Sequence, residues 1–358
     1  MSAGNILTST PTIHIGDRLI GQGAPVFFIA EAGVNHNGDL QRAKALVDAA
    51  ARAGADAVKF QTFKAEELVT RSAPKAQYQL QTTSAEESQL EMISKLELSA
   101  DDHRELIAHC RLKNILFLST PFDQNSVDLL EALKIPAFKI PSGEVTNWPF
   151  LEYVASKGKP VILSTGMSTL EEVEGAFRML RAAGCDDLAI LHCTSSYPAP
   201  PASVNLRAML TLAKTFQVPV GLSDHTSGTE IAIAAAAMGA SVLEKHFTLD
   251  RSLPGPDHRA SLEPGELKAL IGGIRDVESA LGDGWKRPTD AEQDVKGVAR
   301  RSIVSRGAIA PGTLITKELL AYKRPGTGIP PSEAPKVLGR RAARAIAADT
   351  VIRLEDLE

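Results

Sequence analysis

The amino-acid sequence predicts an α/β protein built as a closed (β/α)8 barrel, the TIM-barrel architecture, followed by a small second domain. Eight short, apolar and largely β-branched runs alternate with segments rich in Ala, Leu, Glu and Lys. Strands that alternate with helices at this spacing form right-handed βαβ crossovers and therefore a parallel sheet. Eight such units close into a barrel of about 250 residues, which matches the length of the segment 26–282.

The eight strands are expected at the apolar runs, each of which ends abruptly in polar residues. In chain order the runs are residues 26–33, 57–62, 115–120, 137–143, 161–166, 188–195, 219–226 and 241–248. Helix signals lie between them. Asp39 can cap a helix that Gly54 ends, and Ser168 or Thr169 precedes the acidic first turn of another. Pro264 opens the last barrel helix.

The remaining segments lie before, within and after the barrel. Residues 1–25 form an N-terminal extension, in which residues 11–25 are interpreted as a hairpin that plugs the barrel floor. Residues 63–114 are too long for one loop and one helix, so part of them is expected to extend over the active-site face. The charged stretch 283–300 is interpreted as a linker. Residues 301–358 carry turn signals and short β-prone runs, which indicates a small domain with a marginal core of its own.

Composition and charge narrow the class of protein. Lys and Arg number 39 and Asp and Glu number 43, a net charge of −4, which argues against binding of nucleic acid or an anionic membrane through the overall field. The three cysteines are too few for a disulfide framework, and Cys193 is interpreted as a packing residue. The N-terminus lacks the pattern of a signal peptide, and no run approaches the ~18 apolar residues of a membrane span. We therefore expect a cytoplasmic protein. The net charge does not exclude a small anionic substrate, because it does not describe a local pocket.

Two lysines lie within strands that otherwise read as buried. Polar side chains at the carboxyl ends of barrel strands meet at one mouth, and a buried ammonium group such as that of Lys59 or Lys139 needs an anionic partner. One interpretation is a structural ion pair with Glu31 or Glu144. The other is a bound phosphate or carboxylate, which the hydroxyl and glycine residues at the strand ends favour. A Schiff-base lysine is a third interpretation, but neither lysine is marked as a nucleophile.

Two histidines, His225 and His246, end neighbouring strands. Neutral imidazoles that converge with a carboxylate bind a divalent metal, and an open site of two histidines suits Mn²⁺ or Mg²⁺ better than Zn²⁺. The alternative is a hydrogen-bonded pair without metal. Glu31 is interpreted as a general acid/base with a shifted pKa, or as the ion-pair partner of a lysine. Asp257 is either functional or a turn residue, and His103 is expected at the surface.

Eight sequence blocks, in order along the chain, resemble the signature blocks of one enzyme family, the bacterial sialic acid (nonulosonate) synthases. The blocks are FIAEAGVNHNGD, VKFQT, STPFD, KIPSGE, LSTGM, LHCTSSYP, GLSDHT and EKHFTLDRSLPGPDH. The tail, with IVSRGAIAPGTLI, YKRPGTGI and LGRRAARAIAADTVI, resembles the SAF (antifreeze-like) domain that ends those enzymes. Any single block is weakly specific, but the ordered set covers essentially the whole chain.

The resemblance implies an enzyme that condenses phosphoenolpyruvate with an N-acyl aminohexose and water, giving a nine-carbon 2-keto acid sugar and phosphate. It implies Glu31 as the catalytic glutamate, and His225 and His246 as ligands of a divalent metal ion, Mn²⁺ or Mg²⁺. The residues that it assigns to phosphoenolpyruvate are Lys59, Thr120, Lys139, Ser142, Ser164, Ser195 and Ser223. Those assigned to the sugar are Gln61, Phe122, Tyr197, Asp257 and Arg324. The family forms a domain-swapped homodimer, which implies that Arg324 reaches the partner's sugar pocket.

The resemblance leaves the sugar open, because Ser195 stands where many sialic acid synthases have Asn. The first candidate is N-acetylmannosamine, which gives N-acetylneuraminate. The alternative is 2,4-diacetamido-2,4,6-trideoxymannose, which gives N,N'-diacetyllegionaminate. Three competing classes are a synthase for a plain sugar phosphate, a non-catalytic carbohydrate- or ice-binding protein, and a metal-dependent hydrolase on the same barrel.

Overall fold

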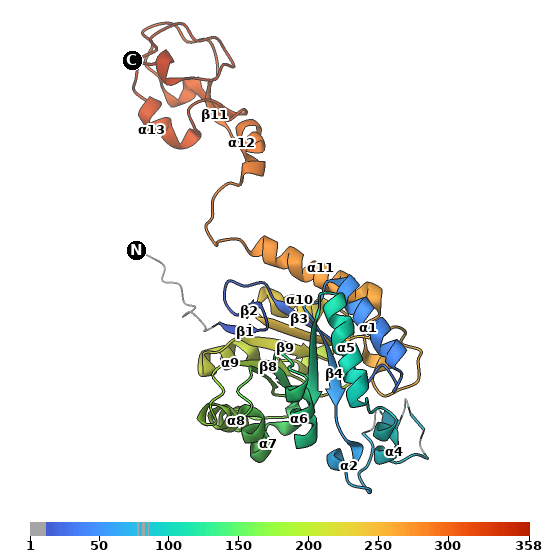
Figure 1. Ribbon diagram of the computed structural model, residues 1–358. Helices are drawn as coiled ribbons and strands as arrows, with labels where there is room; N and C mark the ends of the chain where they lie inside the picture. Colours follow the sequence, from blue (N-terminus) through green and yellow to red (C-terminus); the bar gives the residue numbers. More distant parts are fainter. Residues whose placement is uncertain (1–11, 77–78, 81–82, 85) are drawn as a thin grey trace. The chain divides into compact units, whose positions relative to one another are not determined.

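A computed structural model describes residues 12–76, 79–80, 83–84 and 86–358 of the chain (Figure 1). The chain divides into two compact units, Met1–Gly282 and Asp283–Glu358, and each is described by itself. Within the described ranges, no helix combines the length and the apolar character needed to span a membrane.

The first unit is built on eight parallel strands. They are β3 (Phe27–Gly33), β4 (Ala57–Thr62), β5 (Leu116–Pro121), β6 (Phe138–Ile140), β7 (Val161–Ser164), β8 (Leu188–Cys193), β9 (Val220–Asp224) and β10 (Val242–His246). Their hydrogen-bonded order is β5-β4-β3-β10-β9-β8-β7-β6, and the two end strands, β5 and β6, lie next to each other. The predicted (β/α)8 barrel is therefore confirmed. Several predicted strands were too long at their carboxyl ends, because residues such as Ser142 belong to loops and turns at the mouth.

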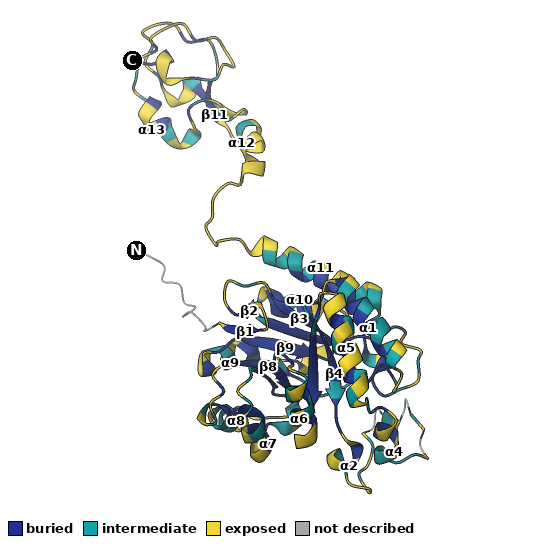
Figure 2. Ribbon diagram, in the orientation of Figure 1, coloured by how far each residue is buried: buried dark blue, intermediate teal, exposed yellow. Residues whose placement is uncertain are grey.

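Helices cover the outside of the barrel (Figures 1 and 2). They are α1 (Leu40–Ala53), α5 (Ala100–Leu112), α6 (Gln124–Ala132), α7 (Trp148–Ala155), α8 (Leu170–Ala182), α9 (Ala208–Phe216), α10 (Glu230–Ala237) and α11 (Pro264–Leu281). The predicted caps are present: Asp39 accepts hydrogen bonds from the amides of Gln41 and Arg42, and Thr169 forms a capping box with Glu172. Figure 2 shows that the inner faces of these helices are buried and their outer faces exposed, as expected for amphipathic helices.

The barrel floor is closed by a short hairpin of β1 (Ile13–Ile15) and β2 (Arg18–Ile20). Ile13, Ile15 and Ile20 are buried against residues at the amino-terminal ends of the barrel strands, among them Phe27 and Val242. This apolar plug lies at the end of the barrel opposite the polar strand termini. It leaves the carboxyl-terminal mouth as the open end.

Among the described residues of the long segment between β4 and β5, the short helices α2 (Ala65–Leu68) and α4 (Gln89–Ser94) precede α5. These helices share a small apolar cluster, and Glu97, in the segment after α4, accepts a hydrogen bond from the Ala65 amide at 2.8 Å. His103, in α5, was wrongly expected at the surface. It is fully buried, with Nε2 2.8 Å from Thr62 Oγ1, because the capping box at Ser99 starts α5 so that His103 faces the barrel.

The second unit has its own apolar core, which contains Ile303, Ile315, Val337 and Ile352. Its regular elements are α12 (Gln293–Ala299), β11 (Ser302–Ser305), β12 (Leu320–Lys323) and α13 (Ala334–Val337). The interpretation of residues 283–300 as a plain linker misses α12. A capping box at Thr289 starts this helical stretch, and its polar composition concealed it in the sequence.

Candidate active site

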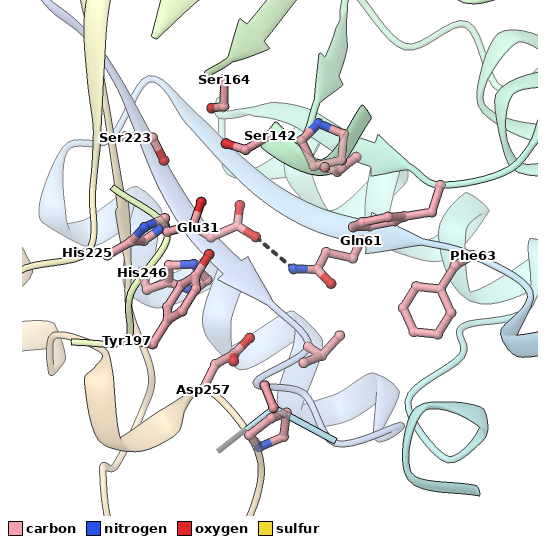
Figure 3. A pocket seen from close by; sticks show the side chains of 18 of the residues that line it. Glu31, Gln61, Phe63, Ser142, Ser164, Tyr197, Ser223, His225, His246 and Asp257 are labelled. Carbon is pink, nitrogen blue, oxygen red and sulfur yellow. Dashed lines mark hydrogen bonds between the residues drawn. The ribbon is translucent and has the colours of Figure 1, made fainter. Parts of the chain in front are cut away.

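A cavity of about 640 Å³ opens at the carboxyl ends of the barrel strands (Figure 3). Every candidate site residue of the first unit lines it: Glu31, Lys59, Gln61, Thr120, Phe122, Lys139, Ser142, Ser164, Ser195, Tyr197, Ser223, His225, His246 and Asp257. Arg324 lies in the second unit, next to β12, and is exposed. The close-up separates three sides of the cavity, with serines on one, histidines and Tyr197 on another, and Phe63 on the third.

Two buried lysines and two buried carboxylates occupy the base of the cavity. Lys59 Nζ lies 2.5 Å from Glu31 Oε2 and donates a hydrogen bond to Thr120 Oγ1 at 2.7 Å. Glu244 lies between the lysines, with its oxygens 3.7 Å from Lys59 Nζ and 3.3 Å from Lys139 Nζ. The lysines thus form structural ion pairs, and Glu31, one of the two partners that the sequence suggested, takes part. Glu144, the other suggested partner, does not, and accepts a hydrogen bond from Asn147.

Sequence reasoning placed Glu244 at the end of the eighth strand but gave it no role in the site, although a signal for one exists. Side chains alternate across a strand, so the residue two positions before His246 points to the same face. Counting back along β10 places Glu244 inside the barrel and Lys245 outside. Lys245 accordingly pairs with Asp224 at 2.6 Å, away from the cavity.

The two carboxylates titrate very differently. Burial raises the pKa of Glu31 to about 7, even though the nearby Lys59 opposes this shift. Burial alone would also raise the pKa of Glu244, but the charges of Lys139 and Lys59 outweigh it and bring that pKa to about 2. At neutral pH Glu244 is therefore a fixed negative charge, whereas Glu31 can exchange a proton.

Hydroxyl groups line the same cavity as the lysines, and Gly166 lies beside two of them; we call this group the cradle. Ser142 Oγ accepts a hydrogen bond from the Gly166 amide at 2.8 Å. Ser164 Oγ is buried and has no hydrogen-bond partner among the residues that the structure describes. A methyl group at Gly166 would lie 2.2 Å from Ser195 Oγ, so only glycine leaves this space open. Free donors next to buried ammonium groups are what a phosphate or carboxylate requires.

The two histidines lie next to each other on one side of the cavity, with ring centroids 5.4 Å apart (Figure 3). His225 Nδ1 lies 2.9 Å from the carbonyl of Thr194, which leaves Nε2 for a ligand. His246 Nδ1 is buried without a hydrogen-bond partner within the described ranges, and burial holds the pKa of His246 well below its usual value. Neutral, unpartnered imidazole nitrogens are suitable metal ligands. The described residues contain no group of three or more His, Cys, Asp or Glu arranged for a metal, so two imidazoles would leave the other coordination positions to water or substrate.

Three further residues complete the cavity wall. Asp257 is buried, and burial raises the pKa of its carboxyl group to about 6. Its backbone carbonyl accepts hydrogen bonds from the Ala260 amide and from Ser261 Oγ in the turn that follows, whereas its side chain makes no capping hydrogen bond there. Gln61 Nε2 donates a long hydrogen bond, 3.5 Å, to Glu31 Oε1. Cys193, interpreted as a packing residue, is buried but also lines the cavity, with Sγ 3.7 Å from His225 Nδ1.

Fold and site together define a class of protein: a (β/α)8 enzyme whose mouth combines hydroxyl groups and two buried lysines with two imidazoles and a carboxyl group that titrates near neutral pH. The model of the NeuB family matches residues 46–286, and that of the SAF domain matches residues 300–358. The chain belongs to the NeuB family and ends in a SAF domain.

Known relatives agree with this assignment. The chain is 50% identical over 342 residues to the N,N'-diacetyllegionaminic acid synthase of Legionella pneumophila, covering 94% of this chain and 96% of that protein. It is also 50% identical over 327 residues to the synthase of the same name from Campylobacter jejuni, covering 91% and 98%. The crystal structure of N-acetylneuraminic acid synthetase from Leptospira borgpetersenii is similar with a TM-score of 0.71 and 35% identity, covering 80% and 95%. The predicted resemblance to sialic acid synthases is confirmed, and the chain is a synthase that forms a C–C bond.

Proposed function

We propose that this enzyme condenses phosphoenolpyruvate with an N-acyl aminohexose of the mannosamine type and water, giving a nine-carbon 2-keto acid sugar and phosphate. The observation that carries the proposal is the meeting, in one cavity, of the anion cradle, the imidazole pair and Glu31. An anionic donor and an aldehyde acceptor would each bind on a different side of the cavity, with Glu31, the acid/base group, between them (Figure 3).

Phosphoenolpyruvate would bind at the cradle. Lys139, Ser142 and Ser164 would hold its anionic groups, and Lys59 would stabilise the charge that develops as phosphate leaves. The open-chain sugar would place its C1 aldehyde at the histidines. A Mn²⁺ or Mg²⁺ ion held by His225 and His246 would supply a Lewis acid for that carbonyl oxygen. In this arrangement C3 of phosphoenolpyruvate would meet C1 of the sugar, where the new bond would form.

Glu31 would act as the general base in the second half of the reaction. After C3 has attacked, C2 carries positive charge and takes up water. The carboxylate of Glu31, with its pKa of about 7, accepts a proton from that water. The C1 oxygen takes up a proton. The tetrahedral intermediate then expels phosphate by cleavage of the bond between C2 and the phosphate oxygen, and the C2 hydroxyl gives its proton to the leaving phosphate, which leaves the 2-keto acid.

The natural acceptor is either N-acetylmannosamine or 2,4-diacetamido-2,4,6-trideoxymannose. The 50% identity to two proteins named N,N'-diacetyllegionaminic acid synthase supports the second sugar, against 35% to one named N-acetylneuraminic acid synthetase. Phosphate release measured across a panel of N-acyl amino sugars tests the proposal. Release should require phosphoenolpyruvate, sugar and divalent metal together. Turnover of arabinose 5-phosphate in place of these sugars, or of simple esters without phosphoenolpyruvate, would contradict it.

We also propose that the enzyme works as a domain-swapped homodimer in which Arg324 serves the partner's sugar pocket. The exposure of Arg324 on the surface of the second unit supports this. The test mixes the inactive variants Glu31→Gln and Arg324→Ala after partial unfolding. Mixed dimers would contain one intact site, so activity should return. Recovery of no activity, with mixed dimers shown by mass spectrometry, would contradict the swap.

We place the enzyme in the cytoplasm, where thiols stay reduced. All three cysteines, Cys110, Cys185 and Cys193, are free and buried, which supports this location. Fractionation of cells that express the tagged chain tests it.

A further inference from the structure

The loop that carries Arg324 is anchored by other parts of the second unit. It follows β12 and spans residues 324–328, which we call the Arg324 loop. Arg324 is exposed, so the position of its guanidinium group depends on the backbone that carries it. The contacts of the loop backbone therefore decide where Arg324 can reach.

Ser302, the first residue of β11, holds the Arg324 loop with a single hydroxyl group. Its Oγ donates a hydrogen bond to the carbonyl of Pro325 at 2.6 Å and accepts one from the Gly328 amide at 2.8 Å. Ser302 is fully buried, so water does not compete for these two bonds. In the β11–β12 ladder Ser302 also pairs with Lys323, the residue before Arg324. One buried residue thus fixes the backbone on both sides of Arg324.

Gly326 brings the Arg324 loop against the end of α12. Its amide donates a hydrogen bond to the carbonyl of Gly297 at 2.8 Å, which lies in the last turn of α12, where helical carbonyls lack an internal partner. A methyl group at Gly326 would lie 2.6 Å from Arg300 Cβ and 3.2 Å from the carbonyl oxygen of Lys296. No side chain fits in this space, so a glycine is needed for the close approach.

The contact with Gly326 also suggests what α12 is for. None of the residues of α12 is buried, and packing contributes little to a helix without an apolar face. Its carboxyl-terminal end nevertheless supplies the acceptor for the Arg324 loop. Two elements of the second unit, β11 and α12, thus support the same five residues.

We infer that Ser302 and Gly326 are positioning residues of the proposed reaction, because they hold the Arg324 loop in the conformation in which Arg324 serves the sugar pocket. The inference rests on the proposed role of Arg324 and adds two residues that touch no substrate themselves. A group that is held in place before binding needs no ordering when the substrate arrives, and a misplacement of about 1 Å can lower a rate by about 10²-fold. Loosening the loop should therefore impair use of the sugar and leave phosphoenolpyruvate binding intact.

Two serines of β11 provide a matched pair of variants. Ser305 is also fully buried, and its Oγ donates a hydrogen bond to the Ala347 carbonyl at 2.6 Å and accepts one from the Thr350 amide at 3.0 Å, in a different turn. Each alanine variant removes one buried hydroxyl with two hydrogen bonds, so thermal unfolding followed by circular dichroism should show similar losses of stability. Ser302→Ala should lower kcat/KM for the sugar by about 10-fold or more with an unchanged KM for phosphoenolpyruvate, whereas Ser305→Ala should keep the wild-type value. Equal kcat/KM for the sugar in both variants would overturn the inference.

Two glycines provide a second, independent pair. A methyl group at Gly307 would meet no atom within 4 Å, and neither Gly307 nor Gly326 has a positive φ, so the two differ in space alone. Gly326→Ala should displace the Arg324 loop and lower kcat/KM for the sugar, and Gly307→Ala should not. This pair decides the inference if Ser302→Ala does not fold.

Mixed dimers separate positioning of Arg324 from a general structural role. In a mixture of Glu31→Gln and Arg324→Ala chains, the one intact site would use Arg324 of the Glu31→Gln chain. Ser302→Ala should lower kcat/KM for the sugar when it is added to that chain, and should have no effect when it is added to the Arg324→Ala chain. Equal losses in the two arrangements would overturn the inference, because Ser302 would then act in another way than through Arg324.

Failure of this inference can be told from failure of the proposed function. If no acceptor supports phosphate release from phosphoenolpyruvate, the proposed function fails and the inference with it. If release occurs but Arg324→Ala keeps the wild-type kcat/KM for the sugar, the role of Arg324 is wrong and so is its positioning. If Arg324→Ala is impaired while Ser302→Ala matches Ser305→Ala, the role of Arg324 stands and only its positioning by Ser302 is wrong.

Discussion

Replacing Glu244 with glutamine should destabilise the first unit in a pH-dependent way. The carboxylate lies 3.3 Å from Lys139 Nζ and 3.7 Å from Lys59 Nζ, and all three side chains are buried. Unit charges at these distances attract by roughly 4–5 kcal/mol each at an effective dielectric constant of about 20. In the variant, Lys59 would still have Glu31 as its ion-pair partner. Lys139 would lose its partner, because Glu244 is the carboxylate that pairs with it among the described residues. Removing one partner of a buried pair costs about 3–5 kcal/mol, which is the expected loss near neutral pH.

The loss should shrink as pH rises. Burial already holds the pKa of Lys139 below its ordinary value of 10.5, and loss of Glu244 lowers it further. Between the folded and unfolded pKa values, the unfolded chain binds more protons than the folded chain, so the stability of the variant increases with pH. Each unit of additional pKa separation corresponds to about 1.36 kcal/mol.

Urea unfolding followed by circular dichroism, at pH 6.5 and pH 9.5, measures both effects. The control is Glu144→Gln, which removes a partly exposed carboxylate beside the cavity and should cost less than about 0.5 kcal/mol. If Glu244→Gln unfolds within 1 kcal/mol of the wild type at both pH values, or loses the same free energy at both, then Glu244 does not hold the charge of Lys139 as argued.

Three further predictions concern the cavity. His225→Ala should weaken Mn²⁺ binding, measured by electron paramagnetic resonance, by more than the roughly 10–100-fold that loss of an outer-shell group costs; unchanged metal affinity and activity would exclude the histidine pair as the metal site. Because the pKa of Glu31 is about 7 and its base form acts, kcat/KM should fall below that pH, and Glu31→Gln should lose about 10²–10⁴-fold in rate together with this acidic limb. If kcat/KM of the variant still fell at low pH, the titrating group would be a residue other than Glu31. Ser164→Ala should raise the KM for phosphoenolpyruvate about 10–100-fold, since a hydrogen bond to a charged group is lost. Gly166→Ala should do the same by crowding Ser195, whereas Gly143→Ala, which meets no atom within 4 Å, should not; equal effects of the two glycine variants would refute the cradle.

The sequence predicted most of the fold and the composition of the cavity lining, because both follow from local patterns. Each strand of a parallel barrel is an apolar run that ends in polar residues, and all eight ends meet at one mouth. Thus residues as distant in the chain as Glu31 and Asp257 could be assigned to one site without any knowledge of their separation in space.

The sequence did not predict features that depend on neighbours brought together by folding. His103 and Glu244 are polar residues whose burial depends on which face of an element meets the barrel. The helix at 293–299 was concealed because its composition is that of a charged linker. Helical and linker segments differ little in composition when neither has a pronounced apolar face.

The amino-acid sequence by itself determined the eight-stranded barrel, the SAF tail and the residue types at the mouth, since spacing and local preference encode them. Only the tertiary structure decided how the charges are shared. It set Glu244 between two lysines and left Glu31 with a pKa of about 7, because burial and charge act through space and not along the chain. It also showed that the cavity has an apolar side, where residues of β3–β5 and the α2–α4 segment meet.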